Sequence, residues 1–357
     1  EVRRRLRKEL FDSLRRLDLL QIFVEDSTVT EIMVNGKDHI FVEREGRLQE
    51  LDMAFESTEK LQDVIQQIVS GCNRVVNEAS PIVDARLPDG SRVNIVMNPV
   101  ALNGPIVTIR RFPEKPVTMD HLLRWSSISR EAAQLLKKLV KAGYNIFISG
   151  GTGSGKTTFL NVLSQYIPSQ ERVITIEDNA ELQLQELPNL VRLETRNSNV
   201  EGCREISIRD LIRASLRMRP TRIIVGEVRG AEAIDMLQCM NSGHDGSMST
   251  GHANSGKDML SRLENMVLMG MEIPLMAIRQ QVASAIDVIV HLGRLRDKTR
   301  RVLEITEVLG CSNNEIVLNP LFEFEEAGED DEGKIVGGLQ EKGKLLRKDK
   351  LKAAGLL

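Results

Sequence analysis

A glycine-rich segment that ends in a lysine and two threonines carries the clearest chemical signal in the chain. Residues 146–158 read IFISGGTGSGKTT, so an apolar run leads into small residues and then into a helical pattern. The spacing fits G-x-x-x-x-G-K-[ST] at every fixed position, and in this motif backbone N–H groups close around phosphate oxygens. The sequence therefore predicts a nucleoside triphosphate site at Gly151, Thr152, Gly153, Ser154, Gly155, Lys156, Thr157 and Thr158.

Two residues of this loop have separate chemical roles in the motif. Lys156 would reach the β- and γ-phosphates, and the hydroxyl of Thr157 would ligate Mg²⁺. The alternative is a flexible Gly/Ser turn that precedes a helix by coincidence. That alternative requires strand, loop and helix to fall by chance into the order that the motif needs, so we favour the phosphate site.

Carboxylates after two apolar runs could supply the remaining chemistry. Glu177 and Asp178 follow the run 173–176, and Glu227 follows the run 223–225 through one glycine. Hydrolysis of a γ-phosphate needs a metal and a group that orients water, and ligands bind at the carboxyl ends of strands in an open α/β sheet. Acidic residues after a strand are also common helix caps. Their joint placement in one phosphate-loop domain favours a catalytic role.

Two histidines and a cluster of arginines are further candidates. His244 lies in GHDG and His252 in TGHAN. A single histidine is more often structural, but two in one segment after a strand indicate a sensor of bound phosphate, and a zinc site would need a third ligand. Arg213 and Arg217 lie near Pro220. They could reach a neighbouring subunit's nucleotide or form a solvated helix face, and the sequence does not choose between these.

Composition limits the class of protein. With 357 residues the chain can form two or three domains, and 41% hydrophobic residues is ordinary for a globular protein. A net charge of -3 and 3% aromatic residues provide neither a general basic surface nor many rings for base stacking, so no nucleic-acid partner is expected. Four scattered cysteines suit neither a disulfide framework nor a zinc site, which favours a reducing cytosol.

The first part of the chain predicts a basic helix followed by a small α+β domain. We place the helical segment at residues 1–28, where it could lie on an anionic membrane or, more commonly, pack on its own domain. The α+β domain would span 29–112, with a helix capped by Ser57 and a hairpin around residues 88–90.

Arginines of this domain lie beside the hairpin turn and at the end of its last strand. Arg92 flanks the hairpin turn, and Arg110 and Arg111 end the last strand. The last two are either solvated charge at a strand end or cations that point across the next linker toward phosphates.

Beyond a proline-containing linker at 113–118, strands alternate with helices. Continuous apolar strands separated by helices predict a parallel sheet that is buried on both faces, which we place at 119–322. The expected strands are 145–149, 173–176, 223–225, 247–250, 286–290 and 301–308. Residues 323–357, first acidic and then basic, are expected to form a mobile charged tail.

Together these motifs resemble the secretion ATPases of type II and type IV systems. The resemblance rests on the phosphate loop, on ITIEDNAEL (174–182), on IIVGEVRG (223–230) and on the two histidine segments. Three further segments resemble the CpaF-like branch, which drives tight-adherence pili: SPIVDARLPDGSRVN (80–94), IRRF (109–112) and AEAIDMLQCMNSGHDG (231–246). The resemblance extends from about residue 30 to the end of the chain.

The resemblance implies a fold and a function. An N-terminal PAS-like α+β domain and a RecA-like P-loop NTPase domain with a mostly parallel sheet would clamp ATP and Mg²⁺. The protein would form a homohexameric motor that hydrolyses ATP to ADP and phosphate and powers assembly, or retraction as well, of a tight-adherence or type IV pilus, or secretion of its subunits. Its partners would be inner-membrane pilus platform proteins, which hold the cytoplasmic motor at the inner face of the membrane.

The resemblance also assigns roles by position. Glu177 matches the acidic-box glutamate that positions water, Glu227 the Walker B acid that holds Mg²⁺ with Thr157, and His252 the histidine near the γ-phosphate. The arginines that would approach phosphates, from the N-terminal domain or a subunit boundary, are Arg92, Arg110, Arg111, Arg213 and Arg217. Gly251 stands where a bulkier apolar residue is expected, which would loosen the strand that carries His252.

Two other functions remain open at this point. A RecA-like nucleic-acid translocase would share the same core, although the acidic balance and the few aromatic residues oppose it. A nucleotide-binding regulatory module would switch a partner without appreciable turnover.

Overall fold

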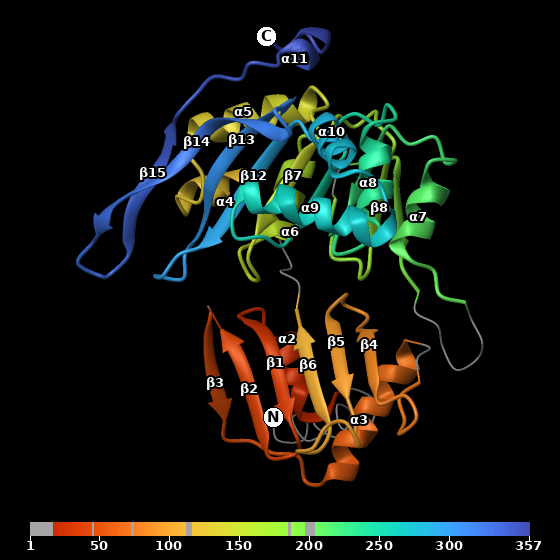
Figure 1. Cartoon of the computed structure of the whole chain (residues 1–357). Helices are drawn as coiled ribbons and strands as arrows, with labels where there is room; N and C mark the ends of the chain where they lie inside the picture. The colour runs from red at the N-terminus through yellow and green to blue at the C-terminus, as the bar shows by residue number, and fades with distance from the viewer. Residues whose placement is uncertain (1–16, 45, 73–74, 112–115, 185–186, 197–203) are drawn as a thin grey trace. The chain divides into compact units, whose positions relative to one another are not determined.

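The computed structural model describes residues 17–44, 46–72, 75–111, 116–184, 187–196 and 204–357. The chain divides into two compact units, Glu1–Lys115 and Pro116–Leu357, which we call the N-terminal unit and the C-terminal unit (Figure 1). Most of the expected basic helix and residues 113–115 of the expected linker lie outside the described residues. The first elements of the described chain are η1 (Asp18–Leu20) and α2 (Gln21–Glu25).

The N-terminal unit is a six-stranded antiparallel sheet in the order β3-β2-β1-β6-β5-β4. Its strands are β1 (Val29–Asn35), β2 (His39–Arg44), β3 (Arg47–Leu51), β4 (Ile82–Arg86), β5 (Arg92–Val96) and β6 (Ile106–Arg110). The predicted hairpin is present as β4 and β5. One helix, α3 (Thr58–Gly71), buries its apolar stripe in the core of this unit, and Ser57 caps it by accepting the Lys60 N–H, as the sequence predicts.

The C-terminal unit is built on a nine-stranded sheet in the order β15-β14-β13-β12-β7-β11-β10-β8-β9. The strands from β12 to β9 in this order are parallel, and β13, β14 and β15 are antiparallel, so the expected mostly parallel sheet is confirmed. The bounds are β7 (Ile146–Gly150), β8 (Val173–Glu177), β9 (Leu190–Glu194), β10 (Arg222–Val225), β11 (Met248–Gly251), β12 (Val288–Arg294), β13 (Arg300–Ser312), β14 (Glu315–Glu329) and β15 (Ile335–Glu341).

Helices cover both faces of this sheet because side chains of each strand alternate between two apolar layers (Figure 1). On β7, Ile146 and Ile148 face one layer and Phe147 faces the other. The first layer holds α4 (Met119–Arg124), α5 (Arg130–Lys141) and α6 (Lys156–Ser164). The second holds α7 (Ile208–Ser215), α8 (Ala233–Met240), α9 (Gly256–Gly270) and α10 (Leu275–Ala285).

The expectation of a mobile charged tail is wrong. Residues 323–341 complete β14 and form β15, and the chain then crosses to α11 (Asp349–Ala353), as Figure 1 shows. On β14, Leu321 and Phe322 are buried while Glu323, Glu325 and Glu326 are exposed, so the strand joins the apolar core at its centre and carries its acidic residues in solvent. A run rich in charge therefore forms part of the sheet.

Among the described residues, none of the helices combines the length and the apolar character that crossing a bilayer requires.

Candidate nucleotide-binding site

The phosphate loop connects β7 to α6, as the motif predicts. Gly155 precedes the helix with φ of +94°, a left-handed conformation that glycine adopts without strain. At Gly150 a Cβ atom would lie 2.5 Å from the carbonyl oxygen of Leu292 and 2.6 Å from Ser154 Oγ, so no side chain fits there. The loop therefore delivers backbone N–H groups to the N-terminus of α6, where the helix dipole attracts anions.

Lys156 is held at this loop by short contacts. Its Nζ donates hydrogen bonds to the carbonyl oxygens of Gly150 (3.0 Å) and Gly151 (2.9 Å), and it lies 3.2 Å from His252 Nδ1. The side chain is only 7% exposed, and burial lowers the pKa of its ammonium group while the Glu227 carboxylate opposes that shift. The ammonium group is thus partly desolvated, and two of its hydrogen-bond partners are neutral carbonyl oxygens.

His252 links the lysine to the carboxylate after β10. Its Nε2 lies 2.9 Å from Glu227 Oε1, and Arg229 Nη2 donates to Glu227 Oε2 at 2.7 Å. Burial, followed by the nearby Lys156 ammonium, lowers the pKa of His252, so the imidazole is neutral at pH 7. A neutral ring can accept from the lysine at Nδ1 and place its Nε2 proton toward the glutamate. The sequence predicted this group of lysine, histidine and glutamate residues at one edge of the sheet.

Glu177 lies at the same edge, but its carboxylate also shapes the backbone. Its Oε2 accepts hydrogen bonds from the N–H groups of Glu181 (2.7 Å) and Leu182 (2.8 Å), and the side chain is 3% exposed. A Cβ at Gly226 would lie 2.8 Å from Glu177 Cγ, so this glycine lets the end of β10 pack against the glutamate. Glu177 therefore fixes the position of the residue that precedes Glu227.

The two predicted histidines do not lie together. His244 precedes β11 and His252 follows it, so the length of a strand separates them. The ring Nδ1 of His244 lies 3.2 Å from the carbonyl oxygen of Cys239 and 3.3 Å from Ser242 Oγ, at the amino edge of the sheet. The expectation that His244 binds the nucleotide of its own chain is therefore wrong, because the loop lies at the carboxyl edge.

Gly251 does not loosen β11, contrary to the sequence expectation. An added Cβ would lie 2.8 Å from Met259 Sδ and 3.0 Å from Phe147 Cε1. Met259 and Phe147 therefore occupy the space that a larger residue would need. The strand is buried along its length and pairs with β7 and β10, so the segment before His252 is firmly held.

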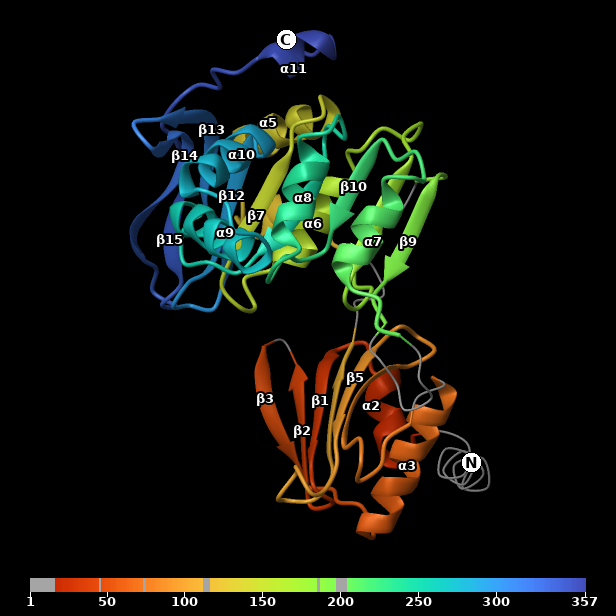
Figure 2. The same ribbon diagram turned by 45° about the vertical axis from the view of Figure 1, so that its right-hand side comes forward.

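Arg213 belongs to α7, which contacts β8 and β9 and lies beside β9 in Figure 2, and Arg217 follows the end of this helix by two residues. Asp235, which is 6% exposed on α8, lies 3.0 Å from Arg213 Nε and 2.6 Å from Arg209 Nε. Arg217 donates to the carbonyl oxygen of Arg213. Arg213 is therefore anchored by a buried carboxylate of the neighbouring helix, and its role toward a second subunit stays a prediction.

The arginines of the N-terminal unit have two different environments. The guanidinium of Arg111 donates to the carbonyl oxygens of Asp26 and of Val29 (3.0 Å), so it stabilises the chain around the start of β1. Arg92 pairs across the sheet with Arg86 on one side and Arg110 on the other. Arg110 in turn pairs across the sheet with Glu31, whose Oε1 lies 3.8 Å from Arg110 Nε, so the row of arginines ends at a carboxylate.

Sequence reasoning missed two residues beside the phosphate loop. Arg300 Nε on β13 donates to the carbonyl oxygen of Gly153 at 2.8 Å, and His291 Nδ1 on β12 lies 2.8 Å from Ser149 Oγ. Each pair is separated by more than 140 residues in sequence, so no local spacing could reveal it. His291 also lies within an apolar run, where a pattern indicates only a buried strand.

Comparison with known families identifies a match over most of the chain. A family model described as "Type II/IV secretion system protein" matches residues 15–323. The type IV secretion system protein PtlH of Bordetella pertussis is 33% identical over 315 residues, which cover 81% of this chain and 93% of PtlH. The conjugal transfer protein TrbB of Rhizobium radiobacter is 31% identical over 325 residues, which cover 90% of this chain and 96% of TrbB. A Mycobacterium tuberculosis protein with a provisional conjugal-transfer name is 34% identical over 295 residues, 80% of this chain and 83% of that protein.

Solved structures share the fold. The ATPase DotB of Legionella pneumophila has a TM-score of 0.57 at 21% identity and covers 80% of this chain and 79% of its own. The pilus retraction motor PilT, solved with ADP, has a TM-score of 0.58 at 17% identity and covers 95% of this chain and 87% of its own. At these identities the two structures support the α/β architecture and nothing finer.

Proposed function

The chain belongs to the type II/IV secretion system protein family, and on that premise we propose that it is an ATPase that powers a secretion or pilus machine. The observation that carries this proposal is the group formed by Lys156, His252 and Glu227 beside the phosphate loop. These three side chains come from three different segments and meet at the edge where an α/β sheet binds its ligands.

The residues at this edge fit ATP with Mg²⁺. In the described part of the chain no three His, Cys, Asp or Glu side chains are close enough to hold a metal ion by themselves. A Mg²⁺ ion at a phosphate loop takes most of its ligands from phosphates and water, so one hydroxyl and one carboxylate suffice. Thr157, in the first turn of α6, and Glu227 would supply these two ligands. When bound, the ion neutralises charge that develops on the phosphate oxygens.

The side chains of this chain divide the remaining work. Lys156 would exchange the carbonyl groups of Gly150 and Gly151 for β- and γ-phosphate oxygens, which are stronger partners because they are charged. His252, neutral at pH 7, holds Glu227 in place and would face the γ-phosphate. Glu177, whose Oε2 accepts two backbone hydrogen bonds, stays the candidate for orienting water. Glu227, which accepts from Arg229 and lies against His252, would serve as the Mg²⁺ ligand.

The finer parts of the proposal concern assembly. We propose a homohexamer in which Arg92 and Arg110 of the N-terminal unit, which are neighbours across β5 and β6, bind phosphate through their charged guanidinium groups. Arg111 would act by holding the start of β1 in place. Arg213 and Arg217 would face the nucleotide of a neighbouring subunit, and residues 113–118 would act as a hinge.

The proposed cargo and location follow from the relatives and from sequence segments. PtlH and TrbB are named for type IV secretion and conjugal transfer, which favours a membrane-bound secretion machine as the partner. The three segments that resemble the tight-adherence branch favour pilin assembly, with retraction as a second possible output. The motor would work in the cytoplasm at the inner face of the membrane, bound to platform proteins.

A steady-state phosphate-release assay on the purified full chain tests the proposal. Oligomer mass should be measured by light scattering with and without a nonhydrolysable ATP analogue, and hydrolysis with and without DNA. Turnover by a ring of six, unaffected by DNA, supports the motor. Tight nucleotide binding without turnover would instead identify a regulatory switch, and DNA-stimulated turnover would identify a translocase. A monomer that ignores nucleotide contradicts the ring.

A further inference from the structure

The arginine of the segment IIVGEVRG (223–230) contacts the proposed Mg²⁺ ligand directly. Arg229 Nη2 donates a hydrogen bond to Glu227 Oε2 at 2.7 Å, and His252 Nε2 lies 2.9 Å from Glu227 Oε1. Each oxygen of this carboxylate therefore already faces a nitrogen atom of a neighbouring side chain. A metal ion that binds Glu227 must share an oxygen with one of these neighbours or take its place.

The two neighbours of Glu227 differ in how firmly they are held. The His252 side chain is 34% exposed, and its Nδ1 lies 3.2 Å from Lys156 Nζ, so the ring has a polar contact on each side. The Arg229 side chain is 65% exposed, so water can replace the carboxylate as a hydrogen-bond partner of its guanidinium. Arg229 is therefore the neighbour that can leave Glu227 at lower cost.

The backbone around Arg229 is fixed by other bonds. Glu232 Oε1 accepts hydrogen bonds from the N–H groups of Arg229 (2.6 Å) and Gly230 (2.9 Å), and the Val228 N–H donates to the carbonyl oxygen of Thr250 (2.9 Å). Glu232 is the N-cap residue of α8 and Thr250 belongs to β11, so the segment is joined to a helix and to a strand. The guanidinium can therefore turn away from Glu227 by rotation about side-chain bonds alone.

A guanidinium and a divalent cation compete for this carboxylate. Both are positive, so they repel each other when they share the oxygens of Glu227, and the doubly charged ion attracts the carboxylate more strongly. The Glu227 side chain is 20% exposed, so its interactions with charge are screened less than those at the open surface. Arg229 therefore offsets the charge of Glu227 before Mg²⁺ binds and opposes the arrival of a second cation.

We propose that Arg229 is a positioning residue that holds the Glu227 carboxylate in place beside His252 and leaves it when Mg²⁺ binds with the nucleotide. Its bond to Glu227 keeps the carboxylate in one orientation, and the breaking of that bond reduces the affinity for nucleotide with Mg²⁺. This inference rests on the proposed function for the identity of the ligand, but binding of nucleotide can be measured without turnover.

Three substitutions isolate the bond between Arg229 and Glu227. Arg229→Ala removes the guanidinium, Arg229→Gln removes its charge but keeps most of the side chain, and Arg229→Lys keeps a cation that can reach Glu227. Arg262→Ala is the matched control. Besides burial and Lys156, the charges of Arg229 and Arg262 lower the pKa of His252, so Arg262 is also a cation near the site. It is exposed on α9, and its loss leaves the bond between Arg229 and Glu227 in place.

The measurement is the dissociation constant of a fluorescent nonhydrolysable ATP analogue for the full chain, once with excess Mg²⁺ and once with EDTA. We expect Arg229→Ala and Arg229→Gln to tighten binding with Mg²⁺ by about threefold to tenfold, because no guanidinium has to leave Glu227. Binding in EDTA should stay equal or weaken, because the bond does not have to break there and a cation near the phosphates is lost. The ratio of the EDTA constant to the Mg²⁺ constant should therefore rise in both variants and stay within about twofold in Arg229→Lys and Arg262→Ala.

The sign of this change separates positioning from a general effect of charge. Loss of a cation weakens the binding of an anionic nucleotide in both media, whereas the proposal requires tighter binding with Mg²⁺. In a Glu227→Gln background, Arg229→Ala should change the ratio by less than about twofold, because the neutral amide holds neither cation strongly. An unchanged or lower ratio in Arg229→Ala and Arg229→Gln, or an equal rise in the Glu227→Gln background, would overturn the proposal.

The same experiment distinguishes failure of this inference from failure of the proposed function. A chain that binds the analogue but releases no phosphate from ATP contradicts the motor, whereas the ratio still decides whether Arg229 gives way to Mg²⁺. A chain that releases phosphate but keeps the same ratio in Arg229→Ala overturns this inference alone. Should Arg229→Ala fail to fold, the comparison of Arg229→Gln with Arg229→Lys decides the matter.

Discussion

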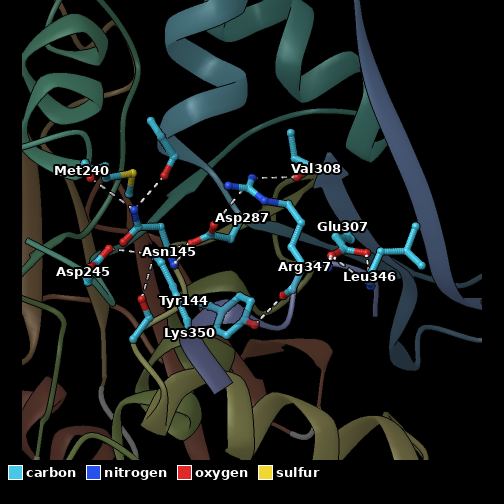
Figure 3. Close-up of polar contacts among 12 residues, drawn as sticks. Tyr144, Asn145, Met240, Asp245, Asp287, Glu307, Val308, Leu346, Arg347 and Lys350 are labelled. Atoms are coloured by element: carbon cyan, nitrogen blue, oxygen red, sulfur yellow. Dashed lines mark hydrogen bonds and ion pairs between the residues drawn. The ribbon is translucent and has the colours of Figure 1, made fainter. Parts of the chain in front are cut away.

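The two edges of the nine-stranded sheet carry the same kinds of side chain in different settings. At the amino edge, Lys350 Nζ lies 2.7 Å from both Asp287 Oδ2 and Asp245 Oδ1, as Figure 3 shows around Asn145 and Tyr144. Asp287 Oδ2 also accepts the Asn145 N–H at 2.8 Å. At the carboxyl edge, the lysine of the phosphate loop has two carbonyl oxygens and an imidazole nitrogen as partners.

The difference between the edges lies in what can replace these partners. A carboxylate holds an ammonium group by a charge-assisted bond, which a ligand would have to match, while a carbonyl oxygen is a weaker partner that a phosphate oxygen can displace. Lys350 therefore stabilises the fold, and Lys156 can bind a ligand. The nature of the partner, more than the charge itself, therefore separates a structural lysine from a binding one.

The largest effect should come from exchanging the two lysines in turn for alanine. Lys156→Ala should lower kcat by at least about 10²–10³-fold, because it removes a cation aimed at developing negative charge, while stability changes little. Lys350→Ala should keep kcat and lower the free energy of unfolding by about 1–3 kcal/mol, because Asp287 loses its ammonium partner. Phosphate release and urea unfolding measure both. Equal loss of activity in the two variants would contradict the assignment of roles.

The two carboxylates give the next largest contrast. Glu227→Gln should bind nucleotide but lower kcat by about 10²-fold or more, because a neutral amide holds Mg²⁺ more weakly than a carboxylate does. Asp287→Asn should leave kcat unchanged and destabilise the fold by about 1–3 kcal/mol. Nucleotide affinity from a fluorescent analogue separates binding from turnover. Full turnover in Glu227→Gln would remove this residue from the mechanism.

The carboxyl edge was largely predictable from the sequence, and the amino edge was not. The phosphate loop, Glu177 and Glu227 follow apolar strands at short distances along the chain, so local pattern and the rules of parallel sheets bring them together. The ion pairs of Lys350 depend on partners 63 residues away or farther, and its segment reads as charged tail. Composition cannot indicate which charges will be buried by a distant element.

The same limit explains the misplaced histidine. His244 and His252 are eight residues apart, a spacing that reads as one loop unless the strand between them is recognised. The short strand β11 (Met248–Gly251) lies between them and places one histidine at each edge of the sheet. Arg300 and His291 illustrate the converse, because they lie at the loop through strand pairing with no sequence signal nearby.

The two histidines should therefore respond differently to substitution. His252→Ala should lower kcat roughly tenfold to a hundredfold, because Lys156 and Glu227 lose the ring between them. His244→Ala should leave kcat and KM within about twofold and cost at most about 1–2 kcal/mol of stability, from its contacts with Cys239 and Ser242. Steady-state kinetics on both variants measures this. A similar loss of kcat in His244→Ala would reopen a role for the amino edge.

The smallest effects should appear in the dependence of stability on pH, with opposite signs for the two edges. The pKa of His252 is lowered in the folded chain, so as pH falls below about 6.5 the unfolded chain takes up a proton that the folded chain refuses, and stability decreases. Burial raises the pKa of Tyr144 to about 12, so above about pH 10 the unfolded chain releases a proton that the folded chain keeps, and stability again decreases. His252→Gln should reduce the loss of stability at acid pH and leave the loss at alkaline pH unchanged. The part of the acid loss that remains would come from His291, whose pKa is also lowered.

Tyr144→Phe should reduce the loss of stability at alkaline pH and leave the loss at acid pH unchanged, because it removes the titrating hydroxyl along with its hydrogen bond to the carbonyl oxygen of Arg347. Urea midpoints between pH 5 and 8 and between pH 9 and 11.5 would separate the two limbs. The ordinary pKa of tyrosine is about 10, so the alkaline window opens there and extends to about 12 in the folded chain. An alkaline loss that persists unchanged in Tyr144→Phe would mean that the amino edge is held by groups other than this hydroxyl, and the contrast between the edges would then rest on Lys350 and Asp287 alone.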